Sequence, residues 1–180
     1  SGERFTRNWS PARTSFTSPC AVWIVRWMGV SPRLAVDRMS LIECIYVAQS
    51  AAASFNPARR LIVQTTASTI RAGIKDQESA YEDAQQLYGV LNLPDPKHIG
   101  ERYPHQVSGG QLQRVMTAMA MSPRPDLLIF DEPTTALDVT TQVEVLASMR
   151  SIVEEFNTAA IYITHDLAVV AQMADVIKVL

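Results

Sequence analysis

The order of apolar and polar residues along this chain predicts strands that alternate with helices. Short, continuously apolar runs are typical of strands buried on both faces of a sheet. Such runs stand at Leu127 to Phe130 and at Ala159 to Ile163, and further strands are expected near Leu41 to Val47 and near Val176. Longer stretches with apolar residues three or four positions apart predict helices. These stretches are 75–92, 111–121, 139–156 and a short one from Leu167.

Polar residues and prolines separate these predicted elements. A polar loop is expected through Pro57, two prolines within 93–96 end the helix before them, and residues 122–125 break the chain before Leu127. The alternation of strands and helices predicts an α/β fold with a mostly parallel sheet. The mainly helical stretch between about Ala67 and Met121 is expected to form a helical subdomain inserted into that fold.

Two adjacent carboxylates, Asp131 and Glu132, directly follow the apolar run that ends at Phe130. A buried parallel strand brings such acids to the carboxyl edge of its sheet, where one can hold a metal ion and the other can orient a water molecule. His165 follows the next apolar run and is expected at the same edge. An acidic pair alone is more often part of a solvated turn. The combination predicts hydrolysis of a magnesium-bound nucleotide.

A second candidate site is the segment VSGGQ at residues 107–111, which we call the signature turn. Ser108 and Gln111 have the spacing of a capping box at the start of a helix, and the two glycines between them allow a compact turn that is rich in backbone donors. A lone SGG is more often only a loop. Because the same sequence also contains the acidic strand end and His165, we interpret the turn as a phosphate-binding site.

Together these motifs resemble those of the nucleotide-binding subunit of an ABC transporter. The resemblance rests on a signature loop VSGGQ (107–111), a Walker B strand LLIFDEP (127–133), a D-loop TALD (135–138), a switch histidine in THD (164–166) and a Q-loop YVAQ (46–49). The run 103–142 and SFNP at 54–57 are most similar to the ATPase subunits of peptide and nickel importers. The resemblance covers about residues 42–176. It implies a partial P-loop NTPase-like ABC ATPase core over 41–180, with its helical subdomain at about 67–121.

The resemblance also implies roles for individual residues. Glu132 would polarise the attacking water, and His165 would contact the γ-phosphate. Asp131 would anchor Mg²⁺, and Gln49 would sense both Mg²⁺ and the membrane partner. The residues implied in binding ATP are Gln49, Ser108, Gly109, Gly110, Gln111 and Asp138. The signature loop would complete the site of a second subunit, because family members sandwich ATP head to tail. ATP and Mg²⁺ are therefore the implied cofactors, and a homodimer or heterodimer is the implied assembly.

The chain departs from the family pattern in its first part. A P-loop requires the sequence GxxxxGK[ST], whereas the lysines stand at 75, 97 and 178 and none follows a glycine. Residues 1–40 form an atypical segment that holds all three tryptophans, at positions 9, 23 and 27, and many arginines. We expect this segment to be displaced or out of frame in a fragment or damaged copy that lacks Walker A. A basic targeting segment is the rival interpretation, which Arg26 weakens because it cuts an apolar run short.

Composition narrows the choice of partners. A formal net charge of -2 predicts no bulk attraction to nucleic acid or to anionic lipid, and no apolar run is long enough to cross a bilayer. Cys20 and Cys44 form neither a metal-binding spacing nor a disulfide framework, which indicates a reducing cytoplasm. Membrane association is therefore expected through transmembrane permease subunits, at the cytoplasmic face of the inner membrane. A solute-binding protein would be an indirect partner.

Three functions remain open on this basis. The first is an ATP-binding and ATP-hydrolysing subunit that energises an importer of peptides, nickel or a related solute, impaired here because the P-loop is absent. The second is a non-transport ABC ATPase; the 59 positions from Gln49 to Ser108 are too few for the long coiled coil of the DNA-repair type. The third is a non-catalytic remnant that has lost nucleotide binding.

Overall fold

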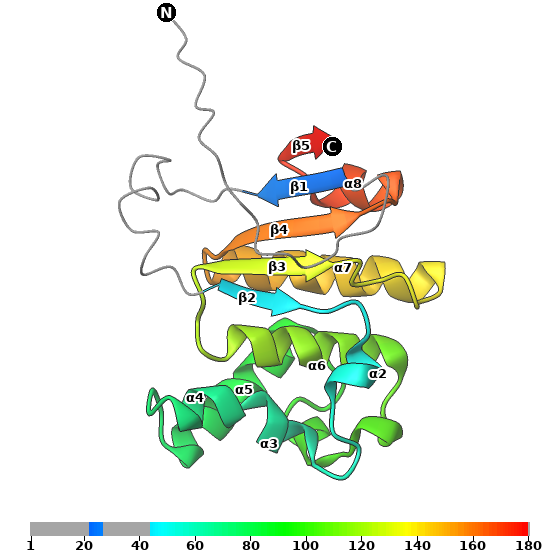
Figure 1. Cartoon of the computed structure of the whole chain (residues 1–180). Coiled ribbons are helices and arrows are strands. Elements are labelled where there is room, and N and C mark those ends of the chain that lie inside the picture. The colour runs from blue at the N-terminus through cyan, green and yellow to red at the C-terminus, as the bar shows by residue number, and fades with distance from the viewer. Residues whose placement is uncertain (1–21, 27–43, 180) are drawn as a thin grey trace, which may run out of the picture.

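The computed structural model describes residues 22–26 and 44–179, which contain a five-stranded sheet. The order of the strands across the sheet is β2-β3-β4-β1-β5 (Figure 1). Strands β2, β3 and β4 are parallel, and β1 lies between β4 and β5 and is antiparallel to both. Four strands therefore run in one direction. The strands are β1 (Val22–Arg26), β2 (Cys44–Val47), β3 (Leu127–Asp131), β4 (Ala159–Thr164) and β5 (Val176–Val179).

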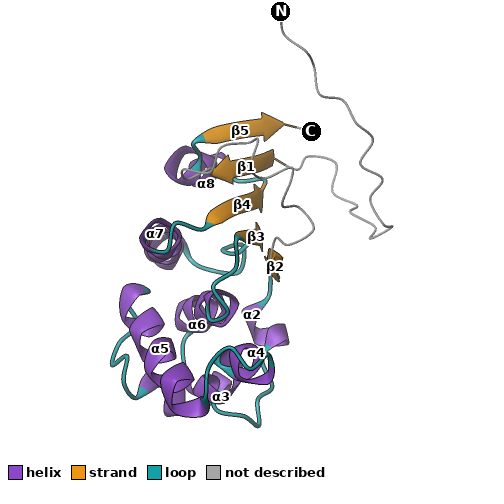
Figure 2. Cartoon of the chain, turned by 90° about the vertical axis from the view of Figure 1, so that its left-hand side faces the viewer, coloured by secondary structure: helices purple, strands orange, loops and turns teal. Residues whose placement is uncertain are grey.

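The described helices form two groups (Figures 1 and 2). Helices α7 (Val139–Glu155) and α8 (Leu167–Met173) lie on the same face of the sheet. The others come between β2 and β3 in the chain and lie beyond the β2 edge. This second group comprises α2 (Ala51–Ser54), α3 (Leu61–Thr65), α4 (Ala67–Arg71), α5 (Gln77–Val90) and α6 (Gly109–Met121), with short 3₁₀ turns η1 (Ile99–Glu101) and η2 (Pro104–Gln106).

Side chains at the helix starts explain where the long helices begin. The Asp76, Ser108 and Asp138 side chains each accept a hydrogen bond from a backbone N–H in the first turn of α5, α6 and α7, respectively. Such N-caps satisfy donors that have no partner within the helix. Helix α6 therefore begins at a fixed residue within the signature turn, and α7 begins directly after the D-loop.

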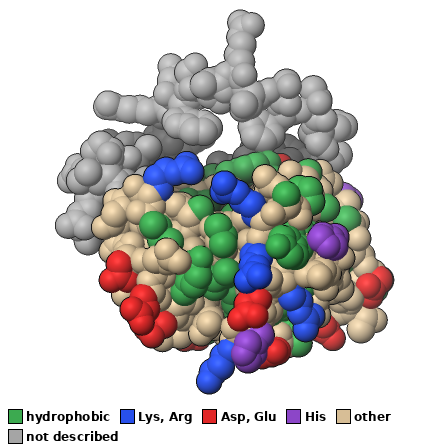
Figure 3. Space-filling view, turned by 90° about the horizontal axis from the view of Figure 1, so that it is seen from below, with side chains coloured by type: hydrophobic (Ala, Val, Ile, Leu, Met, Phe, Trp, Pro, Cys, Tyr) green, Lys and Arg blue, Asp and Glu red, His purple; other side chains and the backbone are tan. Residues whose placement is uncertain are grey.

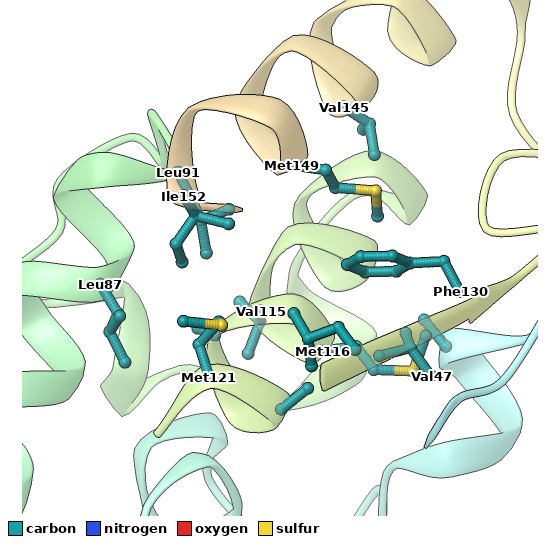
Figure 4. Packing of buried hydrophobic residues seen from close by; sticks show 14 of the residues in the cluster. Val47, Leu87, Leu91, Val115, Met116, Met121, Phe130, Val145, Met149 and Ile152 are labelled. Atoms are coloured by element: carbon teal, nitrogen blue, oxygen red, sulfur yellow. The ribbon is translucent and has the colours of Figure 1, made fainter. Parts of the chain in front are cut away.

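One hydrophobic core joins the sheet to both groups of helices (Figure 4). Phe130 of β3 and Tyr162 of β4 stack with their ring centroids 4.7 Å apart, and both are fully buried. Met149 of α7 lies close to Phe130, while Leu87 of α5 and Met121 of α6 extend the same cluster into the helical part. Continuous packing of this kind fixes α6 and α7 relative to β3.

The structure confirms most of the predicted elements and the α/β fold with a mostly parallel sheet. The strand predicted near 41–47 is β2, and the helices predicted at 75–92, 111–121 and 139–156 are α5, α6 and α7. The loop predicted through Pro57 is wrong in part, because it contains α2. Of the atypical segment 1–40, only residues 22–26 lie within the described part of the chain. The subdomain boundaries remain predictions.

The helical side of the molecule is seen in Figure 3, where hydrophobic side chains are exposed beside Lys and Arg side chains. The exposed hydrophobic residues of α3, α4 and the turn after α4 include Val63, Ile70 and Ile74. Within the described ranges, the structure contains no helix that is both long and apolar enough to pass through a membrane.

Candidate functional site

Glu132 leaves the sheet at the carboxyl ends of two parallel strands. Asp131, the last residue of β3, is in register with Ile163 of β4, and the Glu132 N–H donates to the Ile163 carbonyl at 2.9 Å. Glu132 has a φ of +44°, a left-handed conformation that is unfavourable for a residue with a side chain. Such a conformation costs about 1 kcal/mol and persists where the surrounding structure holds it in place. The chain thus turns sharply at the residue that was predicted to act on water.

The Glu132 carboxylate contacts three side chains, and we call these four residues the Glu132 cluster. Gln49 Nε2 and Thr135 Oγ1 each donate to Glu132 Oε2 at 3.1 Å. His165 Nδ1 lies 2.6 Å from Glu132 Oε1. The structure therefore brings together Gln49, Glu132 and His165, which are far apart in the sequence. Because Nδ1 faces the carboxylate, Nε2 is the His165 ring nitrogen left for a ligand.

Thr135 was missed as a member of this site when only the sequence was considered. Its position three residues after Glu132 was the available signal, since the turn returns its hydroxyl to the carboxylate. The side chain of Glu132 is 23% exposed and that of His165 is 60% exposed. The cluster is therefore open to a ligand from the solvent side.

Tyr46 is a second residue that sequence reasoning missed. Its hydroxyl donates to Asp131 Oδ2 at 2.5 Å, from the neighbouring strand β2. Burial of the hydroxyl, followed by the hydrogen bond to Asp131 and the charge of that carboxylate, raises the pKa of Tyr46 to about 12. The tyrosine therefore remains a neutral donor at physiological pH, and it fixes the Asp131 carboxylate through one of its two oxygens.

The donors at this edge fit a magnesium ion that is bound mainly by a nucleotide. Within the described residues there is no group of three or more His, Cys, Asp or Glu that could hold a metal ion. Mg²⁺ in nucleotide sites is typically held by one or two carboxylates, together with phosphate oxygens and water. Asp131, with Gln49 beside Glu132, can supply such a partial oxygen set.

The signature turn forms the start of α6 as the capping box predicted. Gln111 N donates to Ser108 Oγ at 3.3 Å, and Ser108 N donates to Gln111 Oε1 at 3.0 Å. Both α6 and α7 begin on the side of the molecule toward which β2, β3 and β4 point (Figure 1). The signature turn therefore lies on the same side of the molecule as the Glu132 cluster.

Asp138 serves as the N-cap of α7 in this structure. Its carboxylate accepts a hydrogen bond from Thr141 N at 3.0 Å. Hydrogen bonds from the backbone of the helix start, above all from Thr141, lower the pKa of this exposed carboxyl. The preceding Leu137 lies next to Gly109, since a Cβ on Gly109 would stand 3.4 Å from Leu137 Cδ2. The D-loop thus supports the signature turn from within the same chain.

The two glycines of the turn have different surroundings. Gly109 is exposed, whereas Gly110 is buried, and a Cβ on Gly110 would stand 2.3 Å from Thr141 Cγ2. A separation under 3.0 Å requires the backbone or the threonine to move. Gly110 is therefore required for the close approach of α6 and α7.

We expect Gly110→Ala to lower the free energy of unfolding by about 1 to 3 kcal/mol, the usual effect of overpacking a buried position. Urea denaturation measures this change, with Gly109→Ala as the matched control that meets only ordinary van der Waals contact. Adding Thr141→Ser, which removes the obstructing methyl group, should recover part of the loss. Equal stability of the two alanine variants would contradict this account of the α6–α7 contact.

Comparisons with known proteins agree with this geometry. A family model described as "ABC transporter" matches residues 35–135. The chain is 46% identical over 105 residues to the glutathione import ATP-binding protein GsiA of Pectobacterium atrosepticum, covering 58% of this chain and 17% of the relative. It is 37% identical over 149 residues to the oligopeptide transport ATP-binding protein OppD of Escherichia coli, covering 83% of this chain and 44% of the relative.

A solved structure supports the same fold. The dimeric ATP-binding cassette MJ0796, in a post-hydrolysis state bound to ADP and Pi, matches with a TM-score of 0.59 and 23% identity over 78% of this chain and 59% of that one. The chain spans less than half the length of GsiA and of OppD. The family model nevertheless matches more than half of this chain, over residues that include Gln49, the signature turn and Glu132. This chain therefore belongs to the ABC transporter family.

Proposed function

We propose that this chain is part of the ATP-binding subunit of an ABC importer for peptides, glutathione, nickel or a related small solute. The observation that carries the proposal is the Glu132 cluster, in which a carboxylate at a strand end meets His165 and Gln49. The names of the relatives, which are ATP-binding proteins for glutathione import and oligopeptide transport, support the class of solute.

In the proposed mechanism Glu132 acts on the attacking water. One carboxylate oxygen accepts hydrogen bonds from Gln49 and Thr135 and the other faces His165, so the group is held in one orientation. A carboxylate fixed in this way can accept a proton from water and align it for in-line attack. His165 would turn its Nε2 toward the γ-phosphate and stabilise the charge that develops there.

Asp131 and Gln49 are the residues that we propose to hold magnesium. Bound Mg²⁺ would neutralise charge on the β- and γ-phosphate oxygens. Tyr46 keeps the Asp131 carboxylate in place by donating to Oδ2, which leaves Oδ1 as the oxygen for the metal. The residues present therefore suit ATP with Mg²⁺ as the pair of cofactors.

We further propose that the signature turn serves the ATP site of a second subunit. Ser108 and Gly109 are exposed at the start of α6, where backbone N–H groups and the positive end of the helix dipole favour a phosphate. Gln111 holds the turn through the capping box, and Asp138 holds the start of α7 behind it. The dimeric state of MJ0796 with ADP and Pi supports such an arrangement on this fold.

The membrane partner is proposed to contact the helical subdomain, at about residues 67–121. Ile70 and Ile74 are exposed, as is Val63 just before that range. On the helical side as a whole, hydrophobic side chains are exposed beside Lys and Arg side chains (Figure 3). Mixed apolar and basic surfaces of this kind suit a protein partner. Transmembrane permease subunits would hold the protein at the cytoplasmic face of the inner membrane, with a solute-binding protein acting through them.

The chain contains no GxxxxGK[ST] sequence, and this leads to a prediction about affinity. In this fold the P-loop supplies the amide cradle and the lysine that contact the phosphates. We therefore expect the 180-residue chain to bind magnesium ATP at least about 100-fold more weakly than a version whose residues 1–40 are replaced by a P-loop-bearing segment of a complete family member. Isothermal titration calorimetry measures both affinities.

The outcomes of this titration separate the candidate functions. We call the version with the P-loop-bearing segment the P-loop-restored chain. Tight binding of magnesium ATP by that version only supports an importer subunit that is impaired in the present chain. Micromolar binding by the unmodified chain would overturn the proposed impairment. Failure of a folded, restored chain to bind would favour the non-catalytic remnant, because the residues from Gln49 to His165 would then no longer form a usable site.

A further inference from the structure

Arg114 is a buried cation located one helical turn after Gly110 on α6. The residue is 9% exposed, and no described carboxylate forms an ion pair with it. A buried charge needs compensating partners to be tolerated. In the described part of the chain, the hydrogen bonds of the Arg114 guanidinium all go to backbone carbonyls, which is the first indication that it has a specific task.

The hydrogen bonds of Arg114 connect two segments of backbone. Its Nε donates to the Gly110 carbonyl at 3.3 Å, within the signature turn. Its Nη1 donates to the Asn92 carbonyl at 2.9 Å and to the Leu91 carbonyl at 3.5 Å. Leu91 is the C-cap of α5, and Asn92 after it has a φ of +52°. One side chain therefore links the end of α5 to the start of α6.

The α5 end of this link suits a cation. The last carbonyls of a helix lack partners within the helix and carry the negative end of its dipole, so a positive group there is favourable. The planar guanidinium of arginine places several donors in a fixed geometry, which the single ammonium of lysine cannot reproduce.

Arg114 carries its positive charge at neutral pH despite being buried. Burial lowers the pKa of Arg114, and the charge of Glu144 on α7 partly offsets this effect. An arginine whose pKa is lowered from such a high starting value remains charged at neutral pH.

We propose that Arg114 is the positioning residue of the signature turn, which it ties to the C-terminal end of α5 through the Gly110 carbonyl. The proposal rests on the proposed function, in which the turn contacts the nucleotide of a second subunit. Arg114 is buried and acts on that contact only through Gly110. Movement of the α5 end would thus carry the signature turn with it.

Amide hydrogen exchange of the full chain, followed by NMR without nucleotide, tests this link. The probes are the Leu112 amide, bonded to the Ser108 carbonyl, and the Leu93 amide, bonded to the Tyr88 carbonyl. In Arg114→Met we expect both amides to exchange at least about 10-fold faster, beyond any change at amides in the middle of α7, because the two segments open together. Shifted Gly109 and Gly110 amide resonances should accompany this change.

Arg124→Met is the matched control. Arg124 follows the other end of α6, where it is also partly buried, donates to the Met121 carbonyl at 3.1 Å and pairs with Asp83. Its loss should lower the stability to urea without a selective effect at Leu112 and Leu93. Equal acceleration at these two amides in both variants would reduce Arg114 to a general structural role and overturn the proposal.

Arg114→Lys keeps the test decisive if Arg114→Met does not fold. Lysine retains the positive charge but not the several donors of the planar guanidinium. Stability to urea should therefore be higher than in Arg114→Met, while the Leu112 and Leu93 amides still exchange faster than in the unmodified chain. Unchanged exchange at both amides in Arg114→Lys would overturn the proposal. Because no ATP or partner is present, these outcomes are independent of whether the proposed ATPase function is correct.

Discussion

In a chain with a restored P-loop, Glu132→Gln is expected to lower ATP turnover by about 100-fold to 1,000-fold. The amide has nearly the shape of the carboxylate but cannot accept a proton from the attacking water. The contacts of Glu132 with Gln49, Thr135 and His165 predict that the substituted side chain stays in place. Steady-state phosphate release measures the turnover, and calorimetry should find ATP binding nearly unchanged.

Thr135→Val provides the control for this experiment. It keeps the carboxylate and the side-chain shape but removes one of the two donors to Glu132 Oε2. Its turnover should fall by no more than about 10-fold, which corresponds to one lost hydrogen bond. Unchanged turnover in Glu132→Gln would exclude Glu132 from the mechanism, whatever the result for Thr135→Val.

The long elements of the fold could be predicted because their local signals agree with the tertiary structure. Helix α7 has helical apolar spacing and Asp138 as an N-cap, and strand β3 is a short apolar run beside a proline-rich break. Two of the short helices, α2 and α3, were missed for physical reasons. Helix α3 reads LIVQT, in which β-branched residues favour a strand, but Leu61, Ile62 and Thr65 are buried against neighbouring helices. Packing overrode propensity there.

The proximity of the main residues of the candidate site could be predicted, but their supporting contacts could not. Strand ends at one sheet edge were sufficient to place Glu132 and His165 together, because parallel strands present their carboxyl ends on one side. The sequence does not reveal which hydroxyl reaches which oxygen. Tyr46 of β2 donates to Asp131 of the neighbouring strand β3. Arg114 of α6 donates to the carbonyl of Asn92, just after α5. Such contacts depend on rotamers and helix packing, which periodicity does not specify.

The structure shows which glycine is suitable for testing the signature turn. Gly110 faces Thr141 within its own chain, so any side chain there disturbs folding before it can disturb a partner. Gly109 is exposed at the first position of α6, and Leu137 is the described residue, apart from its chain neighbours, that a Cβ there would contact. An acid in the first turn of a helix is favourable for the helix itself. A charge can therefore be introduced at position 109 with little cost to the fold.

We expect Gly109→Glu in the P-loop-restored chain to abolish the ATP-dependent dimer while leaving ATP binding by the monomer within about twofold of the parent. The carboxylate would enter the space intended for the γ-phosphate of the opposite subunit, where like charges repel in a desolvated contact. Both chains carry Glu132→Gln so that ATP persists, and light scattering follows the dimer. Gly109→Gln, of equal size but neutral, should weaken the dimer less.

Mixing a Gly109→Glu chain with a chain that keeps its glycine sharpens this test. Each dimer has two composite sites, and in the mixed pair only one contains the introduced acid. The mixture should therefore form fewer dimers than the parent and more than the variant alone. If Gly109→Glu instead abolished ATP binding by the monomer, the signature turn would serve the site of its own chain. The head-to-tail dimer proposed here would then be wrong, although the family membership and the Glu132 cluster would stand.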